Sequence, residues 1–319
     1  MIGRREFITL LGGAAAWPLA ARAERSSTPV VAVLSGGRND FPAFTKGVAE
    51  AGYQNARNVS IEFHSGTYDQ LREIAQVLAS RRVAVIVPMG IDAAQAATEA
   101  TSSFPIVFVF GVDPIKFGFL RSLSRPGANV TGMSLYTSEL HAKRIELLDE
   151  VIAAGAPIGM VVNPKMPDTG PQVQDVEASA KAKGHPLVVT KASSADDLDQ
   201  AFAAFANQSV AGVLAVSDNF LYSRRDQIIT LAARYAIPTM YPFREDAVAG
   251  GLLSYGTNIE TIYRQAGIYV GRVLKGENPG DLPVQQPTKF DLVLNLRTAK
   301  TLGVTFPPTL LARADEVIE

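Results

Sequence analysis

The chain of 319 residues contains no cysteine and only three histidines. Without cysteine there can be no disulfide, thiolate zinc site, iron–sulfur cluster or cysteine nucleophile. An excess of positive charge is also missing, because 30 Lys and Arg residues stand against 31 Asp and Glu residues. We therefore expect no nucleic-acid partner. A hydrophobic content of 47% with balanced charge argues against disorder.

Enzyme motifs are equally scarce. No Gly-x-Gly-x-x-Gly follows a predicted strand, no phosphate-binding loop ends in Gly-Lys-Ser/Thr, and there is no Gly-x-Ser-x-Gly elbow. His64, His141 and His185 have no partners at metal-ligand spacing. We predict no catalytic residue, no metal site and no cofactor. An exported α/β hydrolase, with a catalytic triad assembled from separate loops, stays open as an alternative.

A long apolar run opens the chain. Residues 7–20 follow a short basic start that contains Arg4 and Arg5, and small residues surround Arg22 directly after the run. The run is too short to cross a hydrocarbon core of roughly 30 Å as a helix. We therefore predict a cleaved signal peptide over residues 1–23. The Arg4-Arg5 pair resembles twin-arginine export signals, which predicts a periplasmic protein exported by that route.

From residue 30 onward, short β-branched runs alternate with longer Ala- and Leu-rich stretches of helical period. This alternation predicts an α/β protein with parallel sheets that are covered on both faces. The predicted strands are residues 30–35, 59–63, 83–87, 106–110, 158–162, 187–190, 210–217, 239–241 and 290–294. The predicted helices are residues 41–51, 68–81, 92–102, 171–183, 195–207, 224–235 and 258–275.

The two halves of the chain resemble each other. Residues 67–71 match residues 194–198. Each segment begins with a hydroxyl residue, Thr67 or Ser194, that opens a predicted helix. This echo indicates that one α/β lobe was duplicated. Turn-rich residues 126–134, glycine-rich residues 250–256 and proline-rich residues 279–287 mark three crossings between the lobes, which would form a hinge. We predict one lobe from residues 29–132 plus 256–284 and the other from residues 133–255 plus 285–319.

Parallel sheets bind ligands beyond the carboxyl ends of their strands, so the loops at those ends supply the candidate site. The candidate ligand-binding residues are Ser35, Gly36, Gly90, Ile91, Asp113, Asn163, Ser217, Asp218, Tyr241, Glu245 and Tyr255. Hydroxyls and backbone N–H groups suit a carboxylate, acidic side chains suit an ammonium group, and aromatic rings suit an apolar side chain. Each residue also has a purely structural interpretation as a turn or a helix cap. The set predicts a small polar or amphipathic ligand, such as an amino acid or a related carboxylate.

Long segments of the chain are similar to one known family. Residues 4–13, 237–245, 250–256, 263–277, 281–296 and 310–319 resemble ABC transporter substrate-binding proteins. The resemblance is to the branch whose members bind tryptophan, tyrosine or phenylalanine. It implies a type I periplasmic binding protein, in which two Rossmann-like lobes close about a hinge on their ligand.

The same resemblance implies a protein that performs no chemistry and delivers its ligand to an ABC permease in the inner membrane. We expect it to act as a monomer. Two stretches depart from the family's pattern, residues 35–52 and residues 163–168, and both border the predicted cleft. A sensory ligand-binding module that engages a membrane receptor is the second alternative.

Overall fold

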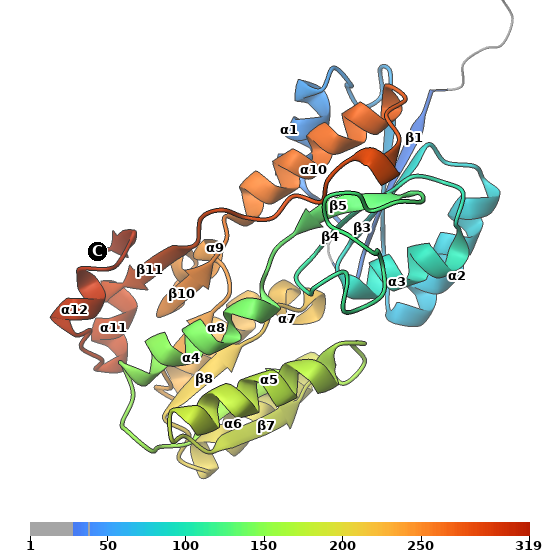
Figure 1. Ribbon diagram of the computed structural model, residues 1–319. Helices are drawn as coiled ribbons and strands as arrows, with labels where there is room; N and C mark the ends of the chain where they lie inside the picture. The colour runs from blue at the N-terminus through green and yellow to red at the C-terminus, as the bar shows by residue number, and fades with distance from the viewer. Residues whose placement is uncertain (1–27, 38) are drawn as a thin grey trace, which may run out of the picture.

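The computed structural model describes residues 28–37 and 39–319 and arranges them in two α/β lobes (Figure 1). The predicted signal peptide, with Arg4 and Arg5, lies outside the described residues. Among the residues that are described, no helix combines the length and the apolar character needed to span a membrane.

The first lobe contains a sheet of five parallel strands in the order β2-β1-β3-β4-β5. These strands are β1 (Val30–Ser35), β2 (Ser60–Ser65), β3 (Val85–Met89), β4 (Ile106–Phe110) and β5 (Val130–Ser134). The three strands β3, β4 and β5 are buried at every position, as expected of parallel strands covered on both faces.

Two pairs of helices cover this sheet. On one face, α1 (Pro42–Glu50) packs along α10 (Ile259–Leu274), which returns from the far end of the chain (Figure 1). On the other face lie α2 (Tyr68–Ser80) and α3 (Ile91–Ala100). The first lobe is therefore discontinuous in sequence.

Strand β5 corrects one expectation. The sequence predicted a turn-rich join over residues 126–134, but Val130–Ser134 form a fully buried strand that pairs in parallel with β4. Gly132 suits this position because a Cβ there would collide with the backbone of Phe108. Glycine has a low propensity for strands, so the sequence pattern indicated a turn. In the folded protein, pairing with β4 outweighs that propensity.

The second lobe contains a sheet of seven strands in the order β12-β11-β10-β9-β8-β6-β7. They are β6 (Ile158–Val162), β7 (Leu187–Lys191), β8 (Gly212–Ala215), β9 (Thr239–Tyr241), β10 (Leu253–Gly256), β11 (Asp291–Asn295) and β12 (Glu316–Ile318). Only the β10–β11 pairing is antiparallel. The prediction of two α/β lobes built on largely parallel sheets is confirmed.

Helices cover both faces of the second sheet as well. They are α4 (His141–Asp149) with the preceding turn η2 (Ser138–Leu140), α5 (Thr169–Ala182), α6 (Ala195–Asn207), α7 (Asn219–Ser223), α8 (Arg225–Arg234), α9 (Arg244–Val248), α11 (Leu296–Leu302) and α12 (Pro308–Leu311). A further short turn, η3 (Pro279–Asp281), precedes the last passage between the lobes.

The topology supports a duplicated lobe. The order β7-β6-β8-β9-β10 in the second sheet repeats the order β2-β1-β3-β4-β5 in the first. The matching segments open equivalent helices. Thr67 precedes α2, where its N–H donates to Gln70 Oε1 at 2.8 Å, and Ser194 caps α6, where its Oγ accepts from Asp197 N–H at 3.2 Å.

One buried cation ties the connecting segments together. Arg144 on α4 is fully buried and donates to the carbonyl oxygens of Tyr255 at 2.7 Å and Thr137 at 2.9 Å. Its second terminal nitrogen lies 3.5 Å from Pro242 O. Thr137 belongs to the passage from β5 to α4, and Tyr255 to the strand that leads back to α10. Arg144 therefore holds two of the connections at fixed positions.

Candidate functional site

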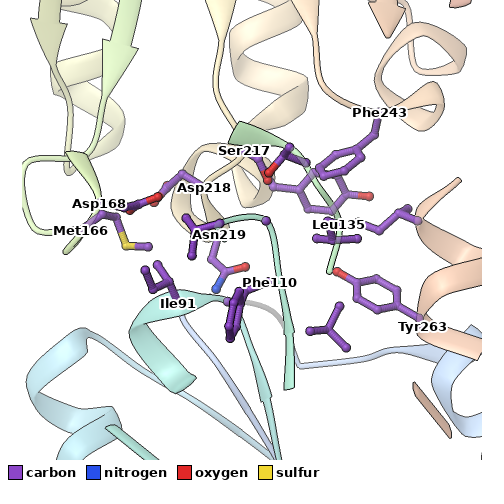
Figure 2. A pocket seen from close by; sticks show the side chains of 17 residues that line it. Ile91, Phe110, Leu135, Met166, Asp168, Ser217, Asp218, Asn219, Phe243 and Tyr263 are labelled. Atoms are coloured by element: carbon purple, nitrogen blue, oxygen red, sulfur yellow. The ribbon is translucent and has the colours of Figure 1, made fainter. Parts of the chain in front are cut away.

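A pocket lies between the two lobes at the carboxyl ends of the strands (Figure 2). Its lining residues are Gly90, Ile91, Val109, Phe110, Gly111, Val112, Leu135, Thr137, Met166, Asp168, Ser217, Asp218, Asn219, Tyr222, Phe243, Ile259 and Tyr263. Ile91 and Phe110 approach from the first lobe, Asp168 and Asp218 from the second, and Tyr263 from α10. The pocket is therefore closed by residues from distant parts of the chain.

Aromatic rings form much of the apolar wall. Tyr222 and Phe243 meet edge to face with ring centres 5.7 Å apart. Tyr263 makes a similar contact with Phe41 at 5.2 Å. Such packing fixes the orientation of each ring, and aromatic rings in a pocket wall suit contact with an aromatic or aliphatic group.

The polar part of the wall is acidic. Burial, reinforced by the nearby Asp92 and Asp168 charges, raises the pKa of Asp218 to about 7. Its Oδ1 accepts from Leu221 N–H at 2.7 Å, and its Oδ2 lies 3.4 Å from the Asn163 amide nitrogen. Burial likewise raises the pKa of Asp92, directly behind the pocket, to about 6.

Asp168 is the third buried carboxyl group. Burial raises its pKa, and only one of its two oxygens, Oδ2, has a hydrogen bond, which comes from Gln172. The other oxygen, Oδ1, is buried and has no hydrogen-bond partner. Since a buried acceptor without a donor costs free energy, Asp168 is suited to bind a donor that enters the pocket.

Asn219 joins the two lobes directly. Its side-chain amide donates to Met89 O at 2.8 Å and lies 3.2 Å from Asp92 Oδ1, both in the first lobe. Gly90 permits this contact, because it has φ of +109° and a Cβ there would collide with the Asn219 amide. The free space in the pocket is about 50 Å³, room for a few water molecules. A ligand as large as an amino acid must therefore move the lobes or the lining side chains apart.

Four of the predicted residues line this pocket, namely Gly90, Ile91, Ser217 and Asp218. Two more lie beside it. Asn163 is near Asp218, and Gly36 packs against the Asp92 carboxyl and Asn219. The predicted site thus draws residues from both lobes to one place.

The other predicted residues lie outside the lining. Ser35 is buried at the end of β1, and Asp113 Oδ1 accepts from Ile115 N–H at 2.8 Å in an adjoining groove. Tyr241 is buried behind Phe243 in a small apolar space of the second lobe. Glu245 lies in the first turn of α9, and Tyr255 O accepts from Arg144. Ligand contact by these residues stays a prediction.

Asp168 and Tyr263 are two of the lining residues outside the predicted set, although the sequence placed residues 163–168 beside the cleft. Asp168 precedes α5 at the end of an irregular loop, where an acidic residue before a helix resembles an ordinary cap. Tyr263 lies on α10, whose return to the first lobe turns this ring toward the pocket. Helical periodicity from Ile259 places Tyr263 on the buried face of this helix. That this face meets the pocket depends on tertiary structure, which the periodicity does not show.

The three histidines, all among the described residues, lie away from the pocket. His64 pairs with Glu62 at 3.2 Å, and His185 bonds to Asp149 Oδ1 at 2.9 Å and Ala156 O at 2.7 Å. His141 is buried with no hydrogen bond at Nδ1, and burial lowers its pKa to about 3. None of the three is hydrogen-bonded to a serine or threonine hydroxyl, as the commonest form of the hydrolase alternative would require.

Comparison with known proteins places the fold and the family. A family model described as ABC transporter substrate binding protein matches residues 36–318. A tyrosine-binding protein of Clostridioides difficile is 27% identical over 263 residues, which are 82% of this chain and 75% of that protein.

Two solved structures share the fold. A conserved domain protein from Vibrio cholerae is 28% identical, with a TM-score of 0.82 over 91% of this chain and 100% of that one. A Streptococcus pneumoniae ABC domain in complex with L-Trp is 23% identical, with a TM-score of 0.79 over 92% of this chain and 100% of that one. The second likeness concerns the fold alone.

Proposed function

The chain belongs to the ABC transporter substrate-binding protein family, and on that premise we propose that it is the periplasmic solute-binding component of an ABC importer. Proteins of this family bind small ligands and work with transporter permeases, and they are not enzymes. The fold is that of type I periplasmic binding proteins. The observation that carries the proposal is the pocket between the lobes, which residues of both lobes line.

We propose an amino acid with an aromatic or large apolar side chain as the ligand. The similarity to a tyrosine-binding protein supports this class. So do the rings of Tyr222, Phe243 and Tyr263, which offer an apolar wall, and the buried carboxyl groups, which suit an amino group. The hydroxyls of Thr137 and Ser217 also line the pocket and suit a carboxylate.

Ligand binding would act through closure of the lobes. Asn219 already joins the second lobe to Met89 and Asp92 of the first. A ligand that contacts both walls, in a pocket widened to admit it, stabilises a closed arrangement over an open one, and a permease can then distinguish the two. Residues 1–23 would direct the chain to the periplasm by the twin-arginine route, where it would act as a monomer.

A thermal-shift screen of the chain from residue 24 onward, against amino acids and small carboxylates, tests the proposal. A ligand at 100 times its dissociation constant should stabilise the folded protein by about 2.7 kcal/mol. Calorimetric titration of each hit then gives the affinity. A dissociation constant of about 100 µM corresponds to only about 5 kcal/mol of binding free energy. If the folded protein binds none of these compounds more tightly than that, the proposed function is wrong.

A further inference from the structure

We infer that the rings of Tyr136, Tyr255 and Phe290 form a cluster, at the segments that connect the lobes, which holds the lobes together without a ligand. None of these three residues lines the pocket. They are positioning residues, which set how readily the lobes separate. The inference rests on the proposed movement of the lobes. It gives Tyr255 a role at the connections, in place of the ligand contact that the sequence predicted.

Three segments connect the lobes, and each brings one ring to the cluster. Tyr136 lies in the first, between β5 and α4, and Tyr255 is on β10, just before the second leads to α10. The third segment leaves the first lobe at Gln285, whose carbonyl oxygen accepts from Ser134 N–H on β5 at 2.8 Å. It ends at Phe290, directly before β11 of the second lobe. Rotation of one lobe relative to the other therefore affects the contacts among these rings.

Phe290 is the centre of the cluster. Its ring centre lies 6.0 Å from that of Tyr136 and 6.2 Å from that of Tyr255, and the ring planes are tilted by 31° and 41°. Ring contacts at such separations are attractive, and each one changes an equilibrium by a factor of about two to ten. All three residues are only partly buried, so water can replace these contacts when the lobes move.

The backbone of Tyr136 supports this role. Its φ of +56° lies in the left-handed region, which a bulky side chain rarely adopts. Hydrogen bonds to the first lobe hold the chain there, because Tyr136 N–H donates to Ser134 Oγ at 3.1 Å and Thr137 N–H donates to Gly111 O at 3.0 Å. In this conformation the ring contacts Phe290, which leads into the second lobe. Backbone strain that persists at such a position points to a function.

The ring cluster and Arg144 act on the connections in different ways. Arg144 is fully buried and holds the carbonyl oxygens of Thr137 and Tyr255, which belong to the first connection and to the strand before the second. Phe290 joins the third connection to both of the others through side chains alone. The partly exposed rings are therefore the contacts that are lost most easily as the lobes separate.

A distance measurement between the lobes tests the inference without any ligand. Since the chain has no cysteine, Val77→Cys on α2 and Val189→Cys on β7 place two nitroxide labels at exposed positions, one on each lobe. Pulsed electron paramagnetic resonance of this protein, from residue 24 onward, gives the distribution of distances between the labels. Phe290→Ala removes two ring contacts and should raise the ratio of long to short distances at least about four-fold, and Tyr136→Ala at least about two-fold. A distribution that Phe290→Ala leaves unchanged overturns the inference.

Further variants separate the ring from general effects on stability. Tyr136→Gly removes the same ring as Tyr136→Ala but relieves the left-handed backbone, so it should open the lobes equally and have the higher thermal midpoint. Opening by Tyr136→Ala alone would overturn the role given to the ring. The matched control is Tyr235→Ala, at the end of α8, where the ring contacts Arg234 instead of a connection. Equal opening by this control would also overturn the inference.

Calorimetry with L-tyrosine and L-leucine distinguishes failure of the inference from failure of the proposed function. An amino acid that the wild-type protein binds should bind more weakly to Phe290→Ala, by no more than the factor by which the lobes open. Weaker binding with an unchanged distance distribution overturns the inference alone. If the wild-type protein binds neither compound nor any other in the screen, the proposed function fails, and the distance measurement still decides the inference. If Phe290→Ala does not fold, Phe290→Leu, which is apolar but has no ring, takes its place.

Discussion

Arg144 should be the side chain on which the joined arrangement of the lobes most depends. Arg144→Met retains an unbranched side chain but removes every donor. The carbonyl oxygens of Thr137 and Tyr255 then lose their bonds of 2.9 and 2.7 Å. Thr137 O keeps only a long hydrogen bond of 3.4 Å from Leu140 N–H. The loss of a short hydrogen bond at a buried acceptor costs about 1–3 kcal/mol, which makes roughly 2–6 kcal/mol for the two.

Part of this loss is offset. Burial lowers the pKa of Arg144 to about 10, so the charge is itself unfavourable at this position, and methionine removes it. We expect a net decrease of about 2–4 kcal/mol in the free energy of unfolding. Arg144→Lys should lose at least as much, because it keeps the buried charge and a single ammonium cannot reach three separate carbonyls.

Urea unfolding followed by far-UV circular dichroism measures this effect. Tryptophan fluorescence is unsuitable, because the one tryptophan, Trp17, lies in the predicted signal peptide. The midpoint should fall by about 1 M urea in both variants. Lys143→Met, an adjacent variant whose ion pair with Glu146 is on the surface, should change stability by less than about 1 kcal/mol. Losses that small for both Arg144 variants would refute the role given to its hydrogen bonds.

Three further predictions follow from individual contacts. Gly90→Ala introduces a Cβ at φ +109° against the Asn219 amide, so calorimetry should show ligand affinity at least roughly ten-fold weaker. Ser194→Ala removes the cap of α6 and should cost about 1 kcal/mol, seen as a thermal midpoint lower by about 2–4 °C. Without ligand, the thermal midpoint should be higher at pH 5 than at pH 8. The pKa values of Asp218 and Asp246 are raised to about 7 by burial, so the stability they contribute in the protonated form is lost as pH rises from about 4 to 7. An unchanged midpoint over that range would contradict the third prediction.

The sequence predicted the architecture well where strands consist of continuous runs of apolar residues. Strands such as Ile106–Phe110 and Ile158–Val162 are apolar at nearly every position, which is typical of strands covered on both faces. Strand β5 was missed because Thr131, Gly132 and Ser134 make it polar and flexible in sequence, and only its pairing with β4 buries it.

The site could be predicted only in part. Ser217 and Asp218 follow a buried strand directly, so the rule that ligands bind at the carboxyl ends of parallel strands locates them. The sequence placed residues 163–168 beside the cleft and residues 256–284 in the first lobe. It did not indicate that Asp168 and Tyr263 are the side chains of these segments that line the pocket. Tyr241 and Tyr255 also lie at strand ends, yet their surroundings in the second lobe and at the hinge place them outside the lining.

A crystal structure of the chain from residue 24 onward, grown with the amino acid that binds best in the screen, tests the central claim most directly. The account predicts that the ligand lies between the lobes, with its amino group within hydrogen-bond distance of Asp168 or Asp218 and its side chain against Phe243 or Tyr263. Density for the ligand anywhere outside this pocket, or a ligand whose amino group turns away from all three aspartates, would contradict it.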